Sequence, residues 1–526
     1  MKIFITVVLC IGAMSLSAQT FDILIKNGKI VDGSGNPWYY GDVGIRAGKI
    51  VSIGKLGDAS AKKTIDATGL AVTPGFIDVH THIESGEFAT PTADNFIYDG
   101  VTSVVTGNCG GSNLNVGAYF RKIDSAKISI NIATLIGHNT VRRAAMGDLQ
   151  RDPTNEEQQK MEQLVAKAMQ EGAVGLSTGL IYVPGTYSKT PEVVGLAKSA
   201  ASFGGLYVSH IRDEGDHVID AVNEAINIGR QAKIPVEISH FKVTYKPNFG
   251  RSKETLALVE NARTEGLDVT IDQYPYVASS TSLDTQVPSW AFGGGRDSLL
   301  WRLKDPATKK RIKAEMVKEL KRKQLKSYSY AVIARYPPDS TLNGKNISEV
   351  NLLKGKKANA SDEIETILDM VAGANRTQMV FYSMDEGDLM RIIQYPFNMV
   401  ASDAGVVKFG SGVPHPRAYG TNARVIGRYV NEKKVIYLEE AIRRMTSLPA
   451  QKFQLRDRGL LREGMAADVL VININEVKDA ATFAKPHAFS QGFRTVIVNG
   501  ELVVENGKHT GKRSGQVLLG PGARKQ

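Results

Sequence analysis

Short apolar runs rich in β-branched residues alternate with longer stretches of helical periodicity between residues 75 and 403. In chain order the runs are GFIDVH, TSVVTGNC, ISINIATLIGH, AVGLSTG, GLYVSH, VEISH, DVTIDQYP and NMVASD. Strands buried on both faces of a parallel sheet read in this way, and these eight runs with intervening helices predict a (β/α)8 barrel of the TIM type. A further run, MVFYSM at 379–384, competes for one of the places, so the assignment of the last strands stays open.

One helix of the barrel region is marked at both of its ends. Thr154 is expected as its N-cap, Glu157 as the capping-box partner, and Gly172 as the C-terminal stop. Residues 285–378 fit no strand–helix unit. They are predicted to form an insertion after the seventh strand, over the barrel end where active sites lie.

Both ends of the chain have a different pattern. Apolar and polar positions alternate between Gly, Asn and Asp turns in residues 21–72, and the same style recurs in 454–520. Two β-rich segments so far apart predict one small β-sandwich domain that is built from both chain ends and flanks a barrel at 73–453. The predicted fold class is therefore α/β.

Residues 1–18 have the pattern of an export signal. A basic residue, Lys2, precedes the apolar stretch IFITVVLCIGAM, and small residues follow in SLSA. The apolar stretch is shorter than the roughly 18 residues that a membrane-spanning helix needs. We therefore expect an exported protein, periplasmic or extracellular, without a stable membrane anchor.

The chain has two cysteines, Cys10 in this signal and Cys109. Removal of the signal would leave Cys109 alone, which excludes an intrachain disulfide in the mature chain. A lone thiol in an oxidising compartment calls for either deep burial or coordination to a metal.

The formal net charge is +11, and residues 301–330 carry eleven Lys or Arg against three Asp or Glu. Such a segment could contact nucleic acid, but no aromatic residues alternate with its charges for base stacking. A solvated helix face is the favoured interpretation, and no nucleic-acid partner is expected. A basic surface would also attract a small anionic substrate without identifying it.

Side chains that bind metals follow several of the predicted strands at their carboxyl ends, which surround the active site of a (β/α)8 barrel. Two of them are two positions apart on one strand, which places both imidazoles on the same side. Imidazole, thiolate and carboxylate together favour Zn²⁺ in a tetrahedral site, with iron and manganese as alternatives. The residues are His80, His82, Cys109, His210, His240 and Asp403.

The segment GFIDVHTH, followed by two SH pairs and an ASD, resembles the amidohydrolase superfamily. The set TGNCGGS, YVSHIRDEG, ISHFK, DQYPY, ASDAG and HPRAYGT is similar to its D-aminoacylase (N-acyl-D-amino-acid deacylase) branch. The resemblance spans nearly the whole mature chain. The fourth strand, AVGLSTG, has no lysine to bridge two metals as in many members of the wider superfamily, and this departure fits the branch.

The resemblance implies a zinc-dependent hydrolysis of the amide in N-acyl-D-amino acids. It implies that Cys109, His210 and His240 hold one tightly bound zinc. His80 and His82 would form a second, weaker site that shares the Cys109 sulfur, and its occupancy stays open. Asp403 would contact the metal water and carry the proton from water to the leaving nitrogen.

An N-acyl amino acid carries a free carboxylate, which needs a cation and hydrogen-bond donors. Lys242 lies two residues past His240 and faces the same pocket if the strand continues. Tyr274 can donate its hydroxyl, and the resemblance supports both contacts; Arg417 is a further candidate because a guanidinium binds carboxylates in a fork. Ile181, after the fourth strand, favours an apolar substrate side chain, whereas the D configuration comes from the resemblance alone.

Other functions stay open at this point. A cyclic-amide hydrolase of the dihydroorotase or hydantoinase kind uses similar histidine and aspartate positions, but the missing strand-four lysine and the NCGG segment oppose it. A deaminase is opposed for the same reasons. A non-catalytic exported binding protein would be expected to lose a ligand, yet all six positions are present. The oligomeric state is not predicted.

Overall fold

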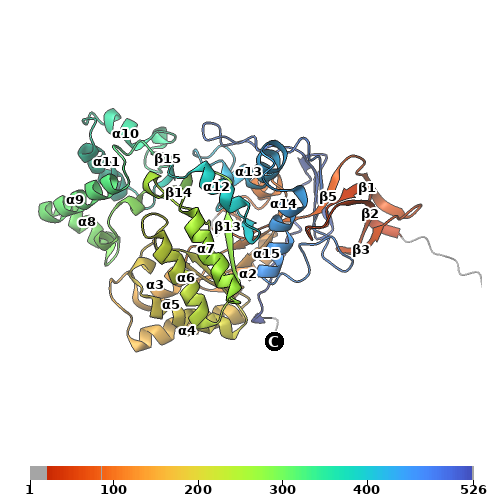
Figure 1. Cartoon of the computed structure of the whole chain (residues 1–526), viewed down its shortest axis with the longest axis horizontal. Coiled ribbons are helices and arrows are strands. Elements are labelled where there is room, and N and C mark those ends of the chain that lie inside the picture. Colours follow the sequence, from red (N-terminus) through yellow and green to blue (C-terminus); the bar gives the residue numbers. More distant parts are fainter. Residues whose placement is uncertain (1–19, 85, 524–526) are drawn as a thin grey trace, which may run out of the picture.

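The computed structural model describes residues 20–84 and 86–523. The predicted signal peptide and Cys10 therefore lie outside the described residues. A barrel occupies the middle of an elongated molecule, with an inserted subdomain at one end and a β-domain at the other (Figure 1). Among the described residues, the structure contains no helix of the length and apolarity that crossing a bilayer requires.

The barrel is built from the eight predicted runs, of which the third is divided by Leu135. Its strands are parallel neighbours in chain order, and a parallel bridge between Thr81 and Ala404 closes the ring between the first strand and the last. The strands are β6 (Phe76–Asp78), β7 (Val101–Thr106), β8 (Asn131–Thr134) with β9 (Ile136–Gly137), β10 (Gly175–Gly179), β11 (Leu206–His210), β12 (Val236–Ile238), β13 (Val269–Gln273) and β17 (Asn398–Val400).

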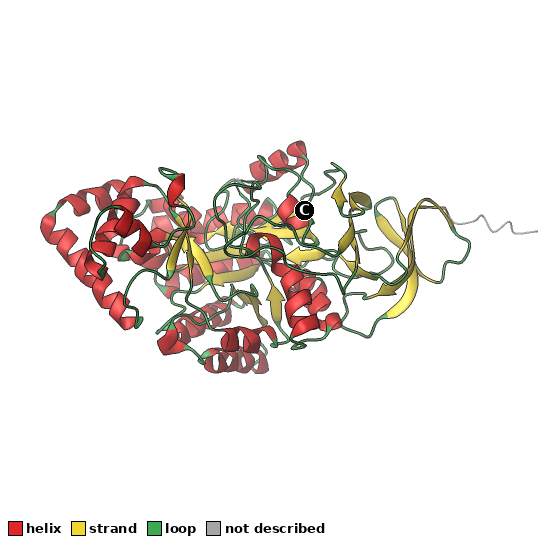
Figure 2. Cartoon of the chain, turned by 90° about the horizontal axis from the view of Figure 1, so that it is seen from above, coloured by secondary structure: helices red, strands yellow, loops and turns green. Residues whose placement is uncertain are grey.

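Helices surround these strands (Figure 2) because each carries one apolar face that packs on the barrel. They are α1 (Asp94–Ile97), α2 (Val116–Ala126), α3 (His138–Met146), α4 (Asn155–Gln170), α5 (Thr190–Ser202), α6 (Val218–Ala232), α7 (Ser252–Thr264), α12 (Glu386–Ile393), α13 (Arg417–Arg424), α14 (Leu438–Met445) and α15 (Ser447–Lys452). The predicted capping box is confirmed at α4, where Thr154 accepts from the backbone of Glu157 and the Glu157 side chain accepts from the backbone of Thr154.

The segment between β13 and α12 forms a subdomain with its own apolar core. The competing run at 379–384 belongs here, because β16 pairs antiparallel with β14 and β15 rather than with a barrel strand. These pairings extend the inserted unit to both sides of 285–378. Its elements are β14 (Ser279–Ser282), α8 (Arg296–Lys304), α9 (Pro306–Arg322), β15 (Ala331–Arg335), α10 (Ile347–Leu353), α11 (Ala360–Gly373) and β16 (Gln378–Phe381).

The basic segment of the sequence is mainly helix α9. Its apolar side, Ile312, Met316 and Leu320, is buried in the core of the subdomain. Two lysines of α9, Lys309 and Lys313, form ion pairs with Glu365 of α11. Part of the local positive charge is thus neutralised inside the subdomain.

Strands from both ends of the chain form one sheet, which in the described residues has nine strands. The sheet curls until Lys49 bridges Ala466, and it encloses a core of mainly Ile and Val side chains. Its strands are β1 (Thr20–Ile30), β2 (Tyr39–Arg46), β3 (Lys49–Gly54), β4 (Ser60–Asp66), β5 (Ala71–Pro74), β18 (Val469–Ile472), β19 (Phe493–Val498), β20 (Glu501–Glu505) and β21 (Lys508–His509). After β21 the chain leaves this sheet. Residues 515–520 then run against the barrel, where Val517 bridges Ile132.

Candidate metal centre

The six predicted metal-binding residues meet at the carboxyl end of the barrel. His210 ends β11, His80 and His82 both follow β6, and Cys109, His240 and Asp403 follow β7, β12 and β17. Ligand atoms of these residues form groups in which all atoms lie within 4.8 Å of one another, among them His80 with Cys109 and His240, and His80 with His82 and Asp403. Residues far apart in sequence are therefore gathered at one site.

Cys109, His210 and His240, the three ligands expected for the tightly bound zinc, lie in mutual contact. The Cys109 sulfur lies 3.4 Å from Nδ1 of His210 and 3.7 Å from Nε2 of His240. The two imidazole nitrogens are 2.7 Å apart, which is a hydrogen-bond distance. One of these two nitrogens therefore carries a proton that a bound metal ion would displace.

This donor set fits a zinc ion. With zinc–ligand bonds of about 2.3 Å to sulfur and 2.0–2.1 Å to nitrogen, a tetrahedral site separates its S and N ligands by about 3.6 Å. The two sulfur–nitrogen distances in the cluster, 3.4 and 3.7 Å, lie on either side of that value. Burial, with the neighbouring His240, holds the pKa of His210 well below its ordinary value, so this imidazole keeps a lone pair for a metal.

His80 and His82 enter the site after β6, His80 next to the Cys109 sulfur and His82 next to Asp403. Nε2 of His80 lies 3.3 Å from the Cys109 sulfur, and its Nδ1 lies 3.3 Å from Oδ2 of Asp272. His82 is more exposed, with 38% of its side chain accessible, and its Nε2 lies 3.2 Å from Oδ1 of Asp403. The Cys109 sulfur thus contacts His80 as well as His210 and His240, as a shared ligand would.

Asp403 connects the metal-binding cluster to a buried cation. Its Oδ2 lies 2.9 Å from Nη1 of Arg417, and both side chains are largely buried. Burial by itself would raise the pKa of Asp403, but the Arg417 charge and the His82 hydrogen bond hold this pKa well below the usual value. Asp403 is therefore a carboxylate in this site and can accept a proton.

Lys242, Tyr274 and Arg417 form a group of donors next to the ligands. The Tyr274 ring lies beneath both cations, 5.5 Å from Nζ of Lys242 and 4.5 Å from the Arg417 guanidinium. The strand does not continue to Lys242, as the prediction for this residue required: β12 ends at Ile238, and Lys242 reaches His240 from the loop that follows. Ile181 follows β10 with 37% of its surface exposed.

The backbone is strained at three of the site residues. Cys109, His240 and Asp403 have φ angles of 53°, 35° and 50°, in the left-handed region that non-glycine residues rarely adopt. Such conformations cost of the order of 1–3 kcal/mol each and persist where the surrounding structure holds them. Here they turn three metal-binding side chains toward one point.

Sequence reasoning missed the residues that hold these side chains. Asp272 accepts from the backbone N–H of His240 and contacts His80. Glu214 lies beside both His240 and Lys242. His415 accepts from the backbone N–H of Arg417 through Nδ1. Glu214 and His415 lie in segments already noted for the resemblance, YVSHIRDEG and HPRAYGT, but their partners depend on loop conformations that no spacing rule gives.

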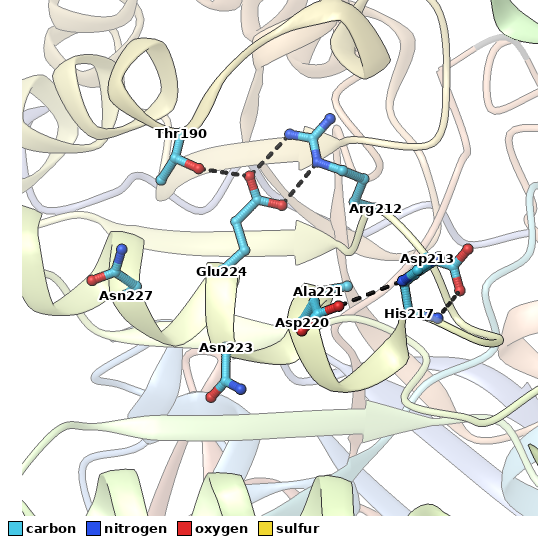
Figure 3. A pocket seen from close by; sticks show the side chains of 9 residues that line it. All are labelled: Thr190, Arg212, Asp213, His217, Asp220, Ala221, Asn223, Glu224 and Asn227. Carbon is cyan, nitrogen blue, oxygen red and sulfur yellow. Dashed lines mark hydrogen bonds and ion pairs between the residues drawn. The ribbon is translucent and has the colours of Figure 1, made fainter.

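A pocket of about 450 Å³ lies on the outer side of the loop after β11 (Figure 3). Arg212 forms a two-pronged ion pair with Glu224 there and also donates to the backbone oxygens of Thr186 and Ser188. The charge of Arg212 is thus already satisfied. The pocket is lined by none of the six predicted ligands, and its ion pair anchors the loop that carries Glu214.

Comparisons with known proteins agree with this fold and site. The family model described as Amidohydrolase family matches residues 63–504. The chain is 35% identical to the D-aminoacylase of Alcaligenes xylosoxydans xylosoxydans, over 95% of this chain and 98% of that protein. It is also 35% identical to the N-acyl-D-glutamate deacylase of the same organism, over 92% and 93% of the two chains.

A solved structure gives a similar result. The crystal structure of N-acyl-D-glutamate deacylase from Bordetella bronchiseptica, complexed with zinc and a phosphonate inhibitor that mimics the tetrahedral intermediate of the reaction, has a TM-score of 0.82 and 35% identity. The structural match covers 95% of this chain and all of the deacylase chain. Barrel and site together define a metal-binding hydrolase. The chain belongs to the amidohydrolase family, in the branch of the D-aminoacylases.

Proposed function

We propose that this chain is an exported, zinc-dependent hydrolase that cleaves the amide bond of N-acyl-D-amino acids. The observation that carries the proposal is the position of Asp403, which lies between the histidine ligands and the buried cation Arg417. A proton carrier, metal ligands and a carboxylate-binding group are thereby within reach of one small substrate. The relatives named above supply the substrate class.

Cys109, His210 and His240 would hold the tightly bound zinc ion, and His80 and His82 with the shared Cys109 sulfur would hold a second, weaker one. Bound zinc supplies a water of lowered pKa and polarises the carbonyl group of the scissile amide. The pKa of the free Cys109 thiol is raised well above its ordinary value by burial, so metal binding would release the thiol proton.

Asp403 would move the proton of the reaction. As a carboxylate it accepts the proton of the attacking water, and it returns this proton to the nitrogen when the carbon–nitrogen bond breaks. The products are a carboxylate and a free amino acid, so the atoms of water are divided between them. The positive charge of Arg417 keeps Asp403 ionised and ready to accept the proton.

Arg417, Lys242 and Tyr274 would bind the α-carboxylate of the substrate. Both cations are largely buried, and within the described residues the hydroxyl of Tyr274 makes a weak contact, 3.8 Å to the sulfur of Met384. Buried cations bind a carboxylate more strongly than exposed ones because water competes less. Ile181 would contact the substrate side chain and favour an apolar one.

The first experiment is an assay of the purified mature protein on N-acetyl-D-methionine and N-acetyl-L-methionine, before zinc removal, after it, and after zinc is restored. We expect release of the D amino acid only, lost on chelation and recovered with zinc. Hydrolysis of a cyclic ureide in place of both amides would contradict the substrate class. Hydrolysis that is unchanged after complete metal removal would contradict the zinc dependence.

Export has its own test. Intact-mass measurement of the protein recovered from the periplasm or the medium should give a chain that begins at Gln19. A chain of full length that remains in the cytoplasm would contradict this part of the proposal and leave the reaction unaffected.

A further inference from the structure

Glu214 lies where the metal site and the carboxylate site meet. Its Oε1 atom is 3.1 Å from Nδ1 of His240 and 2.5 Å from Nζ of Lys242. The same oxygen lies 3.9 Å from Nε2 of His210. One carboxylate oxygen thus contacts a ligand histidine and a substrate-binding lysine, and only 13% of the Glu214 side chain is exposed.

The backbone of Glu214 is fixed from two sides. Its carbonyl oxygen accepts from the backbone N–H and the hydroxyl of Thr244, in the loop after β12. From the outer side, the ion pair of Arg212 with Glu224 anchors the same loop (Figure 3). The backbone of Glu214 is therefore held by contacts that do not involve His240.

The hydrogen bonds at Nδ1 of His240 exclude one another. Nζ of Lys242 lies 2.8 Å from this nitrogen and has only hydrogens to donate, so this contact requires Nδ1 without a proton. The contact to Glu214 requires the opposite, because a carboxylate oxygen only accepts. In a neutral imidazole exactly one of the two ring nitrogens carries the proton, and the choice sets which partner His240 has.

A metal ion on Nε2 of His240 settles the choice, because Nε2 must then give up its proton and Nδ1 must carry one. Glu214 is the acceptor that this proton meets. Lys242 loses its contact to Nδ1 but keeps its contact to Glu214 and to the backbone oxygen of His240, 2.8 Å away. At least one Nζ hydrogen becomes available to another acceptor.

We propose that Glu214 is a positioning residue that selects the Nδ1–H form of His240 and holds Lys242, so that metal binding readies Lys242 for the substrate carboxylate. The proposal rests on the function proposed above. It assigns Glu214 no contact with the substrate, since it acts through His240 and Lys242. Carboxylate partners of this kind orient metal-ligating histidines and raise their basicity.

The test compares zinc affinity in four proteins by competition with a chromophoric chelator: the wild type, Glu214→Gln, Glu214→Asp and Asp220→Asn. Asp220 is the matched control because it is a carboxylate on the adjacent helix α6 with 82% of its side chain exposed. We expect Glu214→Gln to bind zinc roughly 10- to 100-fold more weakly than the wild type. Glu214→Asp, which keeps the charge, should recover part of this loss, and Asp220→Asn should bind as the wild type does.

A second measurement separates positioning from a loss of structure. At saturating zinc, Glu214→Gln should regain most of its kcat on N-acetyl-D-methionine but keep a raised KM, because Lys242 has lost its charged partner. Equal zinc affinity in Glu214→Gln and the wild type would overturn the proposal while leaving the proposed function intact. A wild type that binds no zinc would overturn both.

Discussion

The two ends of the barrel are built from the same strands but by opposite means. At the carboxyl end, three non-glycine residues of the metal centre have left-handed backbone conformations. At the amino end, residues 515–520 lie against the barrel in backbone hydrogen bonds, such as that from the N–H of Leu518 to the oxygen of Ile132 at 2.8 Å. At the carboxyl end the strained residues surround one candidate site, whereas at the amino end a backbone segment from the C-terminal part of the chain covers the strands.

Close contact at the amino end depends on glycine. A Cβ atom at Gly520 would lie 2.1 Å from the carbonyl oxygen of Ala173, and one at Gly515 would lie 2.0 Å from that of Ile130. Backbone atoms cannot move aside as a flexible side chain can. In barrels of this type, the carboxyl end carries catalysis and the amino end carries stability. Substitutions at the two ends should therefore have separable effects.

The largest effect is expected from Asp403→Asn at the carboxyl end. An amide of the same shape cannot accept the proton, so kcat on N-acetyl-D-methionine should fall by roughly 10²- to 10⁴-fold. Zinc bound by the cysteine and its two histidines should stay, because those three ligands remain. Kinetics with metal analysis of the same preparation would check this, and a kcat within tenfold of the wild type would contradict the role of Asp403.

Gly520→Ala tests the amino end. The added methyl group must displace the segment or the strand it covers, which we expect to lower the free energy of unfolding by about 1–3 kcal/mol. The kcat at 25 °C should not change, because the metal centre lies at the other end of the barrel. Denaturant unfolding would measure the loss, with Arg513→Ala, an exposed position two residues before the segment, as the unaffected control. An equal loss in both variants would refute the contact argument.

The sequence was sufficient for the barrel strands because each is buried on both faces and reads as a continuous apolar run. It was insufficient for β16, since an apolar run does not reveal its partner, and this one pairs inside the inserted subdomain. It also gave no sign that residues 515–520 pack on the barrel, because their contacts are made by the backbone.

The predicted metal-binding residues could be chosen from the sequence because His and Cys are rare in this chain and these residues follow strand ends. Glu214 could not, because it lies in the charged stretch RDEG, which looks like an ordinary surface loop. The contact of Glu214 with His240 depends on the backbone turn at His240, where φ is 35°. Candidate metal ligands can be recognised in a sequence by their residue type. The residues that orient those ligands are recognised only from their contacts in the structure.

Lys452 tests how the amino end tolerates a buried charge, and its effect per pH unit is small. Its Nζ contacts Oδ1 of Asp268 at 3.0 Å, and burial lowers its pKa from 10.5 to about 8. Between pH 8 and 10.5 the unfolded chain therefore binds more protons at this lysine than the folded chain does. Stability contributed by this group must rise with pH across that window, by less than about 1.4 kcal/mol per pH unit.

Lys452→Met should remove this rise, so the difference in unfolding free energy between wild type and variant should change steadily from pH 8 to 10.5. Denaturant titrations at several pH values would measure it, and comparing the two proteins cancels the other groups that titrate there. A constant difference would mean that Lys452 is not desolvated in the folded protein.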